Sequence, residues 1–115
     1  MGTNQDLPIE IQPIDDGTIV RPSGDIDLSR APAFRVHLAE VFQSAPQRVV
    51  IDLSNVPYMD SSGVATLVEG MQLASRGSVK LVLVGLQERV RSIFEIARLD
   101  TVFTIALDVN EAEKL

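Results

Sequence analysis

The spacing of hydrophobic residues changes between a period of two and a helical period along this chain. Ile9 and Ile11 alternate with polar residues, which is typical of a half-buried strand. Residues 15–17, Asp-Asp-Gly, follow this run, and an Asp-Gly pair between apolar segments indicates a hairpin turn. Residues 18–21 are then the returning strand. Pro22 belongs at an edge or a strand end, because proline cannot donate a hydrogen bond to a neighbouring strand.

Three longer segments carry apolar residues at helical spacing. The first begins near Ser29 and ends at residues 44–46, and its expected buried face is Phe34, Leu38, Val41 and Phe42. The second covers residues 61–76 with Gly77 as its stop, and should bury Val64, Leu67, Val68, Met71 and Ala74. The third covers residues 87–98, and should bury Val90, Ile93, Phe94 and Ala97.

Short apolar runs at 49–53, 79–84 and 102–105 indicate strands between and after these helices. Residues 108–111 resemble a capping box that opens a terminal helix. A hairpin followed by alternating helices and strands predicts an α/β fold. We expect a loosely ordered N-terminus at 1–8 and one domain at 9–115, with a mixed sheet of about four to five strands and about four helices.

Composition narrows the classes of function. The chain has 115 residues, which fits one domain, and its net charge of −6 argues against nucleic acid and anionic membrane surfaces as partners. It contains no cysteine, so a thiolate nucleophile and a disulfide are excluded. No apolar run approaches the roughly 18–20 residues of a membrane span, and the first residues lack the pattern of a signal peptide. We therefore expect a cytoplasmic protein.

The segment at 60–63, Asp-Ser-Ser-Gly, stands where a strand and loop give way to the second helix. Backbone N–H groups at a helix start are unpaired and favour negative charge, and Asp and Ser are ordinary capping residues. A seryl hydroxyl exposed here can be phosphorylated by another protein, which adds about −1.5 to −2 charges. We expect Gly63 to expose the backbone to a partner.

Several enzymatic chemistries lack their residues. The segment at 60–63 lacks the first glycine of a serine hydrolase elbow, and His37 is the only histidine. No phosphate-binding Gly-x-x-x-x-Gly-Lys motif occurs. The candidate metal ligands are loop carboxylates that suit turns and caps better, namely Asp15, Asp16, Asp25 and Asp27. We therefore expect neither an enzyme nor a bound metal or cofactor.

A phospho-aspartate receiver domain is a stronger rival, since Asp52 ends the central strand and Pro57 follows it. Against it, the gap from Asp to Pro is one residue longer than in the usual receiver motif. The acidic pair at 15–16 follows an alternating strand, and the late strand ends in Val84-Gly85 without a lysine. A phosphate on Asp52 would be labile to acid, whereas a phosphate on serine is stable, so acid stability separates the two alternatives.

The segment at 51–65, Ile-Asp-Leu-Ser-Asn-Val-Pro-Tyr-Met-Asp-Ser-Ser-Gly-Val-Ala, resembles the signature of the STAS domain, and more narrowly that of anti-sigma factor antagonists. Residues 24–27, Gly-Asp-Ile-Asp, are similar to the Gly-Glu-Leu-Asp stretch of that family. The later strand and helix of the family match residues 79–85 and 90–99. The resemblance covers roughly residues 9–107, nearly the whole chain.

This resemblance implies a STAS-like fold and a partner-switching protein. Unphosphorylated antagonists bind an anti-sigma factor that is also a serine kinase. The kinase phosphorylates the serine after the aspartate, which is Ser61 here, and a PP2C-type phosphatase reverses the step. The residues implied in partner binding are Asp25, Asp27, Asp60, Ser61, Ser62 and Gly63.

Other STAS proteins leave alternatives open. The chain could be a subunit of a lipid-transport ABC system, although that type often has threonine at the position of Ser61, or a partner switch that does not act on a sigma factor. The residues leave open whether Ser61 or Ser62 is the acceptor, and whether the chain is a monomer or a dimer.

Overall fold

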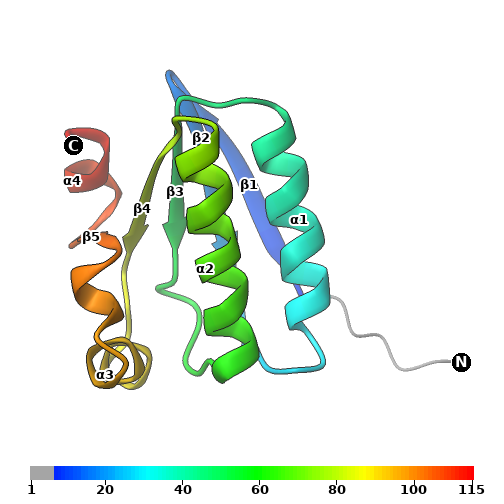
Figure 1. The fold of residues 1–115 in the computed structure, drawn as a ribbon, viewed down its shortest axis with the longest axis vertical. Coiled ribbons are helices and arrows are strands. Elements are labelled where there is room, and N and C mark those ends of the chain that lie inside the picture. The colour runs from blue at the N-terminus through cyan, green and yellow to red at the C-terminus, as the bar shows by residue number, and fades with distance from the viewer. Residues whose placement is uncertain (1–6) are drawn as a thin grey trace, which may run out of the picture.

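A five-stranded mixed sheet forms the centre of the computed structural model, which describes residues 7–115 (Figure 1). The first two strands form an antiparallel hairpin, and the later strands add to it in parallel, in the order β1-β2-β3-β4-β5. The strands are β1 (Ile9–Ile14), β2 (Gly17–Pro22), β3 (Arg48–Asp52), β4 (Lys80–Val84) and β5 (Thr104–Ala106). The predicted α/β fold with an N-terminal hairpin is confirmed.

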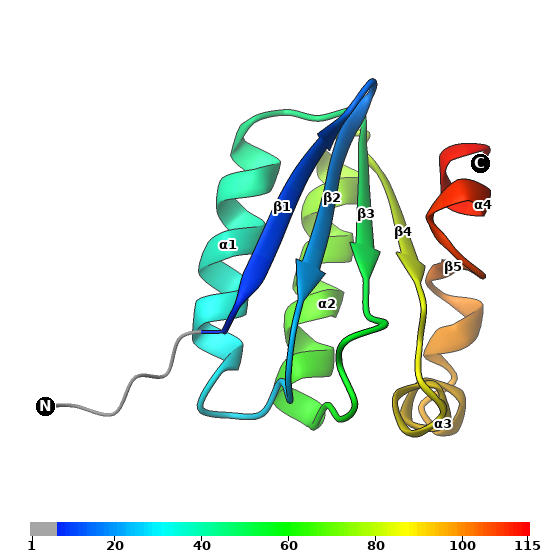
Figure 2. The same ribbon diagram turned by 180° about the vertical axis from the view of Figure 1, so that it is seen from behind.

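Three of the four α-helices connect the parallel strands, and the fourth follows the last strand. Figures 1 and 2 show α1 and α2 side by side on one face of the sheet. The helices are α1 (Ala31–Gln43), α2 (Ser61–Arg76), α3 (Glu88–Ile96) and α4 (Val109–Glu113), with a short 3-10 helix at Leu99–Thr101. Within residues 7–115, no helix has both the length and the apolar character that crossing a bilayer requires.

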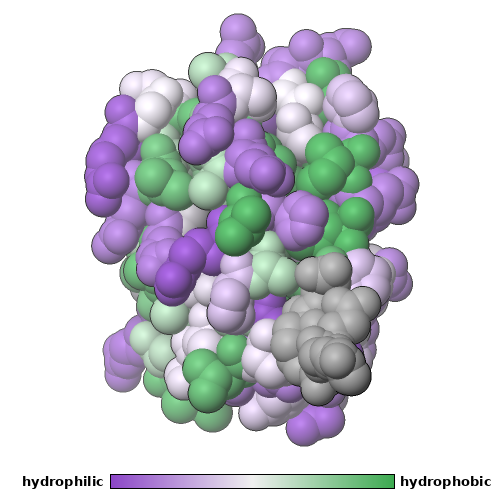
Figure 3. Space-filling model, turned by 90° about the vertical axis from the view of Figure 1, so that its right-hand side faces the viewer, coloured by the Kyte–Doolittle hydropathy of each residue, from purple (hydrophilic) through white to green (hydrophobic). Residues whose placement is uncertain are grey.

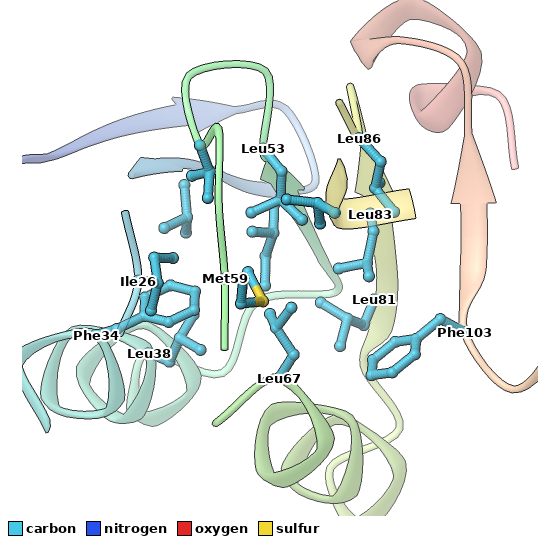
Figure 4. Close-up of a cluster of buried hydrophobic side chains, with 14 of the residues drawn as sticks. Ile26, Phe34, Leu38, Leu53, Met59, Leu67, Leu81, Leu83, Leu86 and Phe103 are labelled. Atoms are coloured by element: carbon cyan, nitrogen blue, oxygen red, sulfur yellow. The ribbon is translucent and has the colours of Figure 1, made fainter. Parts of the chain in front are cut away.

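The central strand β3 is buried on both faces. Val49 and Ile51 of β3 belong to the larger core cluster under α1 and α2, whereas Val50 between them belongs to a smaller cluster that includes Ala112 of α4. A strand that is covered on both sides needs a continuous apolar run, which is the pattern in residues 49–51. Figure 4 shows part of the larger cluster, in which Met59 lies among the buried side chains of the core.

Some boundaries differ from those predicted. The first helix begins at Ala31, because Asp27 first caps a separate turn at residues 28–30. At the end of α2, Gly77 has a φ of −93°, and it is Ser78 that takes a left-handed φ of 56°. The last strand begins at Thr104, two residues later than expected, because Phe103 turns into the core before the strand starts.

The folded part of the chain begins before residue 9. Leu7 was expected in the loosely ordered N-terminus, but its side chain is only 2% exposed and packs in the larger core cluster. The carbonyl of Pro8 accepts a hydrogen bond from the N–H of Ser23. The expectation for residues 1–6 lies outside the described residues.

Exposed apolar side chains occur on several elements. Ile11 of β1 is 44% exposed and Val36 of α1 is 57% exposed. On the side of the molecule next to β1 and α1, hydrophobic side chains stand among hydrophilic ones (Figure 3). Single exposed apolar residues of this kind are common on soluble domains and need no functional explanation.

Candidate partner-binding site

Two loops at the carboxyl ends of β2 and β3 lie side by side and form the candidate site. The N–H of Ile26 donates to the carbonyl of Tyr58 at 3.0 Å, and the N–H of Asp60 donates to the carbonyl of Ile26 at 3.2 Å. Ile26 and Met59 thus form a parallel bridge outside the main strands. Functional loops in open α/β sheets gather at this edge.

Asp60 holds both loops together. Its Oδ1 accepts hydrogen bonds from the N–H groups of Ser62 at 2.9 Å and Gly63 at 3.3 Å, and from the hydroxyl of Ser62. Its Oδ2 accepts a hydrogen bond from the N–H of Leu28 at 3.1 Å. One carboxylate therefore caps α2 and also fixes the loop that leads to α1.

The hydrogen bonds at Asp60 also set its charge. The hydroxyl of Ser62 contributes most to lowering the pKa of Asp60, partial burial opposes this, and the N–H groups of Ser62, Gly63 and Leu28 lower the pKa further. Hydrogen bonds to the ionised form favour that form. Asp60 therefore carries a negative charge at neutral pH.

The two adjacent serines have different surroundings. Ser61 is exposed at the first position of α2, and its hydroxyl has no hydrogen-bond partner among residues 7–115. Ser62 is half-buried, its hydroxyl donates to Asp60, and its carbonyl accepts a hydrogen bond from the hydroxyl of Thr66. Of the two, Ser61 is the hydroxyl that an external enzyme can reach without breaking a hydrogen bond.

Gly63 is buried, so the expectation that it exposes the backbone is wrong. A Cβ atom at Gly63 would lie 2.5 Å from Cγ of Met59 and 2.7 Å from the carbonyl oxygen of Ile26. Real side chains do not approach this closely. Glycine at this position therefore allows α2 to pack against the two loops.

The loop before α1 repeats the capping pattern of Asp60. Oδ1 of Asp27 accepts hydrogen bonds from the N–H of Ser29 at 3.1 Å, the hydroxyl of Ser29 at 2.7 Å and the N–H of Arg30 at 3.2 Å. The hydroxyl of Ser29 is the main cause that lowers the pKa of Asp27. Asp25 lies in the same loop, where its carbonyl accepts a hydrogen bond from Arg30 at 3.4 Å. The structure thus brings the predicted residues of both segments together.

Leu28 is the residue of this area that the sequence interpretation missed. It stands between Asp27 and Ser29, and its side chain is 75% exposed. Asp-x-Ser occurs at 27–29, 52–54 and 60–62, and Leu28 takes the place in the first motif that Ser61 takes in the third. The motif alone was not a sufficient signal, because Leu53 in the second one is buried.

The other candidate residues do not form a catalytic group. His37 is half-buried on α1, with Glu40 as its acidic neighbour at 3.9 Å. Asp52 pairs with Arg21 at 3.2 Å. Within residues 7–115, no three His, Cys, Asp or Glu residues lie close enough to hold a metal ion. The order β1-β2-β3-β4-β5 with antiparallel β1 differs from the flavodoxin-like order 2-1-3-4-5, which argues against the receiver alternative.

The fold and the two capped loops define a known class. The family model for the STAS domain matches residues 8–112, so the chain belongs to the STAS domain family. The resemblance that residues 51–65 and 24–27 suggested is confirmed at this level.

Regulatory proteins are among its relatives. The anti-sigma-B factor antagonist of Staphylococcus epidermidis is 28% identical over 109 residues, which cover 95% of this chain and 97% of that protein. An anti-sigma factor antagonist from Mycobacterium paratuberculosis has a similar structure, with a TM-score of 0.87, 23% identity, and coverage of 99% of this chain and 97% of that one. The phosphorylated form of SpoIIAA from Bacillus has a TM-score of 0.72 at 17% identity, and covers 93% of this chain and 98% of that one.

Proposed function

We propose that this chain is an anti-sigma factor antagonist controlled at Ser61. It binds an anti-sigma factor with serine kinase activity while Ser61 is unphosphorylated, and phosphorylation of Ser61 by that kinase releases it. A PP2C-type phosphatase restores the binding form. The observation that carries the proposal is the exposed hydroxyl of Ser61, which has no hydrogen-bond partner among residues 7–115 and follows the ionised carboxylate of Asp60 directly in the chain. The names of its relatives support the same class of function.

The geometry of α2 explains how a phosphate on Ser61 would act. It adds about −1.5 to −2 charges next to Asp60. Asp60 already accepts the N–H groups of Ser62 and Gly63, so the phosphate cannot use these donors and stays directed at the solvent or a partner. The helix start still favours negative charge, so the fold should persist.

A partner docked over Ser61 would meet the added bulk and would have to desolvate the phosphate. Penalties of several kcal/mol lower affinity by orders of magnitude, since about 1.4 kcal/mol corresponds to a factor of ten. Phosphorylation would therefore act mainly on binding and leave the stability of the domain nearly unchanged.

The other residues of the site have supporting roles in this proposal. Asp60 and Ser62 fix the first turn of α2 and so the position of Ser61. Asp25 and Asp27 lie in the neighbouring loop and contribute to the partner-binding surface. Gly63 sets the close packing between this helix and the loops. The chain is then a substrate and a ligand of its partners, with no catalytic residue of its own.

Labelling with ATP and mass spectrometry tests the acceptor. We expect an anti-sigma factor kinase from the same genome to add one acid-stable phosphate to the wild-type chain and none to Ser61→Ala. Ser62→Ala is the matched control and should still be labelled. Labelling that disappears in Ser62→Ala but persists in Ser61→Ala would move the site to Ser62.

Binding measurements test the switch. Ser61→Asp should fold like the wild type but bind the kinase far more weakly, which calorimetry would show. An unchanged affinity would contradict the switch mechanism. Recovery of a membrane ABC ATPase with the tagged chain, in place of a soluble kinase, would favour the lipid-transport alternative.

A further inference from the structure

A shallow groove of about 270 Å³ lies between the N-terminal ends of α1 and α2. Its lining is mostly apolar and consists of Leu28, Ala31, Pro32, Arg35, Ser62 and Ala65. Among these lining residues, Arg35 of α1 pairs with Glu69 of α2 at 2.8 Å. The volume is below the range of about 300–1,000 Å³ that is typical of small-molecule sites, so a side chain of a protein partner fits it better.

Leu28 is exposed but held in place. Its N–H donates to Oδ2 of Asp60, and the residues on either side belong to the cap formed by Asp27 and Ser29. Most exposed leucines carry no meaning by themselves. A leucine whose backbone is already fixed loses less conformational freedom when it binds, and such preorganised residues are well suited to act as anchors.

The groove is continuous with the phosphorylation site of the proposed function. Ser62 lines the groove and follows Ser61 directly in α2. Leu28 stands beside two carboxylates, since it follows Asp27 and its N–H contacts Asp60. Both carboxyl groups have a lowered pKa and are ionised at neutral pH, mainly through the hydroxyls of Ser29 and Ser62. An apolar centre with a charged rim is the usual anatomy of a protein interface.

We propose that Leu28 and this groove are the apolar anchor for the anti-sigma factor kinase. The kinase would place an apolar side chain in the groove against Leu28, and basic side chains opposite Asp27, while Ser61 lies at the end of the contact. This inference rests on the proposed function. The anchor also provides a geometric cause for the release of the kinase, because a phosphate on Ser61 would separate the kinase's apolar side chain from the groove.

A pair of leucine variants tests the anchor. Leu28 is 75% exposed and Leu107 is 73% exposed. Leu107 follows β5, which lies at the edge of the sheet farther from α1 (Figure 1). With the kinase that labels Ser61 as the probe, Leu28→Ser should weaken binding by about tenfold or more. Leu107→Ser should bind like the wild type, and Leu28→Met should keep most of the affinity. Both serine variants should unfold at the wild-type temperature, since both side chains are exposed.

Phosphorylation kinetics give a second readout. Leu28→Ser should raise KM for phosphorylation of Ser61 and leave kcat unchanged, because the groups around the hydroxyl stay intact. Wild-type binding by Leu28→Ser, together with loss of binding by Ser61→Asp, would overturn the anchor and leave the proposed function standing. Equal losses in Leu28→Ser and Leu107→Ser would also overturn it. Wild-type binding by Ser61→Asp, or no labelling by any such kinase from the genome, would overturn both.

Discussion

The first turn before α1 and the first turn of α2 are built in the same way but present different groups to the solvent. In residues 27–30 and in residues 60–63, an aspartate caps the turn and a serine two positions later donates its hydroxyl to that aspartate. The residue between them is exposed in both cases, and it is Leu28 in one and Ser61 in the other. One scaffold thus displays an apolar side chain and an exposed hydroxyl in adjoining loops.

The difference between the two turns lies in how they connect to the rest of the molecule. Among residues 7–115, the carboxylate of Asp27 accepts hydrogen bonds only from its own turn, whereas that of Asp60 also accepts one from Leu28 in the other loop. The fourth position is Arg30 in the first turn and the buried Gly63 in the second. The turn of α2 is therefore integrated in the core, and its exposed serine stands on a more rigid base.

The largest expected effect on stability comes from Gly63, the fourth residue of the second turn. Gly63→Ala should lower the free energy of unfolding by about 1–3 kcal/mol, because the new methyl group overlaps Met59 and a backbone carbonyl of Ile26. Urea denaturation at 25 °C measures this change.

Gly70→Ala is the matched control in the same helix. Its Cβ would lie 3.6 Å from Leu38 and 3.8 Å from Phe42, which is ordinary contact. Alanine should therefore stabilise the helix by about 0.5–1 kcal/mol. Equal stability of the two alanine variants would contradict the view that the second turn is integrated in the core.

The next largest effect on stability is expected at the capping aspartates, where the two alanine variants should differ. Asp60→Ala should lower the free energy of unfolding by about 1 kcal/mol, because it removes the cap of α2 and the bond to the N–H of Leu28. Asp27→Ala removes bonds within one turn and should have a smaller effect. The same denaturation experiment compares them, and a larger loss for Asp27→Ala would reverse the comparison.

Alanine variants of the two neighbouring serines should differ in stability by a smaller amount than those of the aspartates. Ser62→Ala removes a hydroxyl that donates to Asp60 and should lower the free energy of unfolding by about 0.5–1 kcal/mol. Ser61→Ala removes an exposed hydroxyl without a partner in residues 7–115, and should be neutral within about 0.5 kcal/mol. Thermal unfolding of both variants would detect this, and a destabilised Ser61→Ala would show that its hydroxyl has a structural partner.

The smallest expected effect is the change with pH in the contribution that Asp60 makes to stability. The pKa of Asp60 lies below its ordinary value of 3.8 in the folded state, so its contribution to stability is present above that pH. It is lost as the pH falls through the lower, folded-state pKa. The difference in stability between wild type and Asp60→Ala should therefore be constant near neutral pH and shrink below about pH 3.8. If the stability difference between the two proteins grew as the pH fell, folding would raise the pKa of Asp60 instead of lowering it.

Local patterns in the sequence were sufficient for most of the fold. Helical spacing and the cap at Asp60 predicted α2 at residues 61–76, and the structure has it at Ser61–Arg76. The Asp-Gly pair predicted the hairpin of β1 and β2. Predictions failed where a distant contact decides the local structure. Phe103 turns into the core and delays β5, and Leu7 packs in the core although it precedes any periodic segment.

By itself, the sequence determined the order of elements, the cap at Asp60 and the position of Ser61 at the start of a helix, because these depend on residues a few positions apart. Only the tertiary structure decided what surrounds that serine. The contact between Asp60 and Leu28 spans 32 residues, and Arg48 holds the carbonyl of Ala112 across 64 residues. Such contacts follow from which strands become neighbours in the sheet. The burial of Gly63 and the groove beside Leu28 have the same origin.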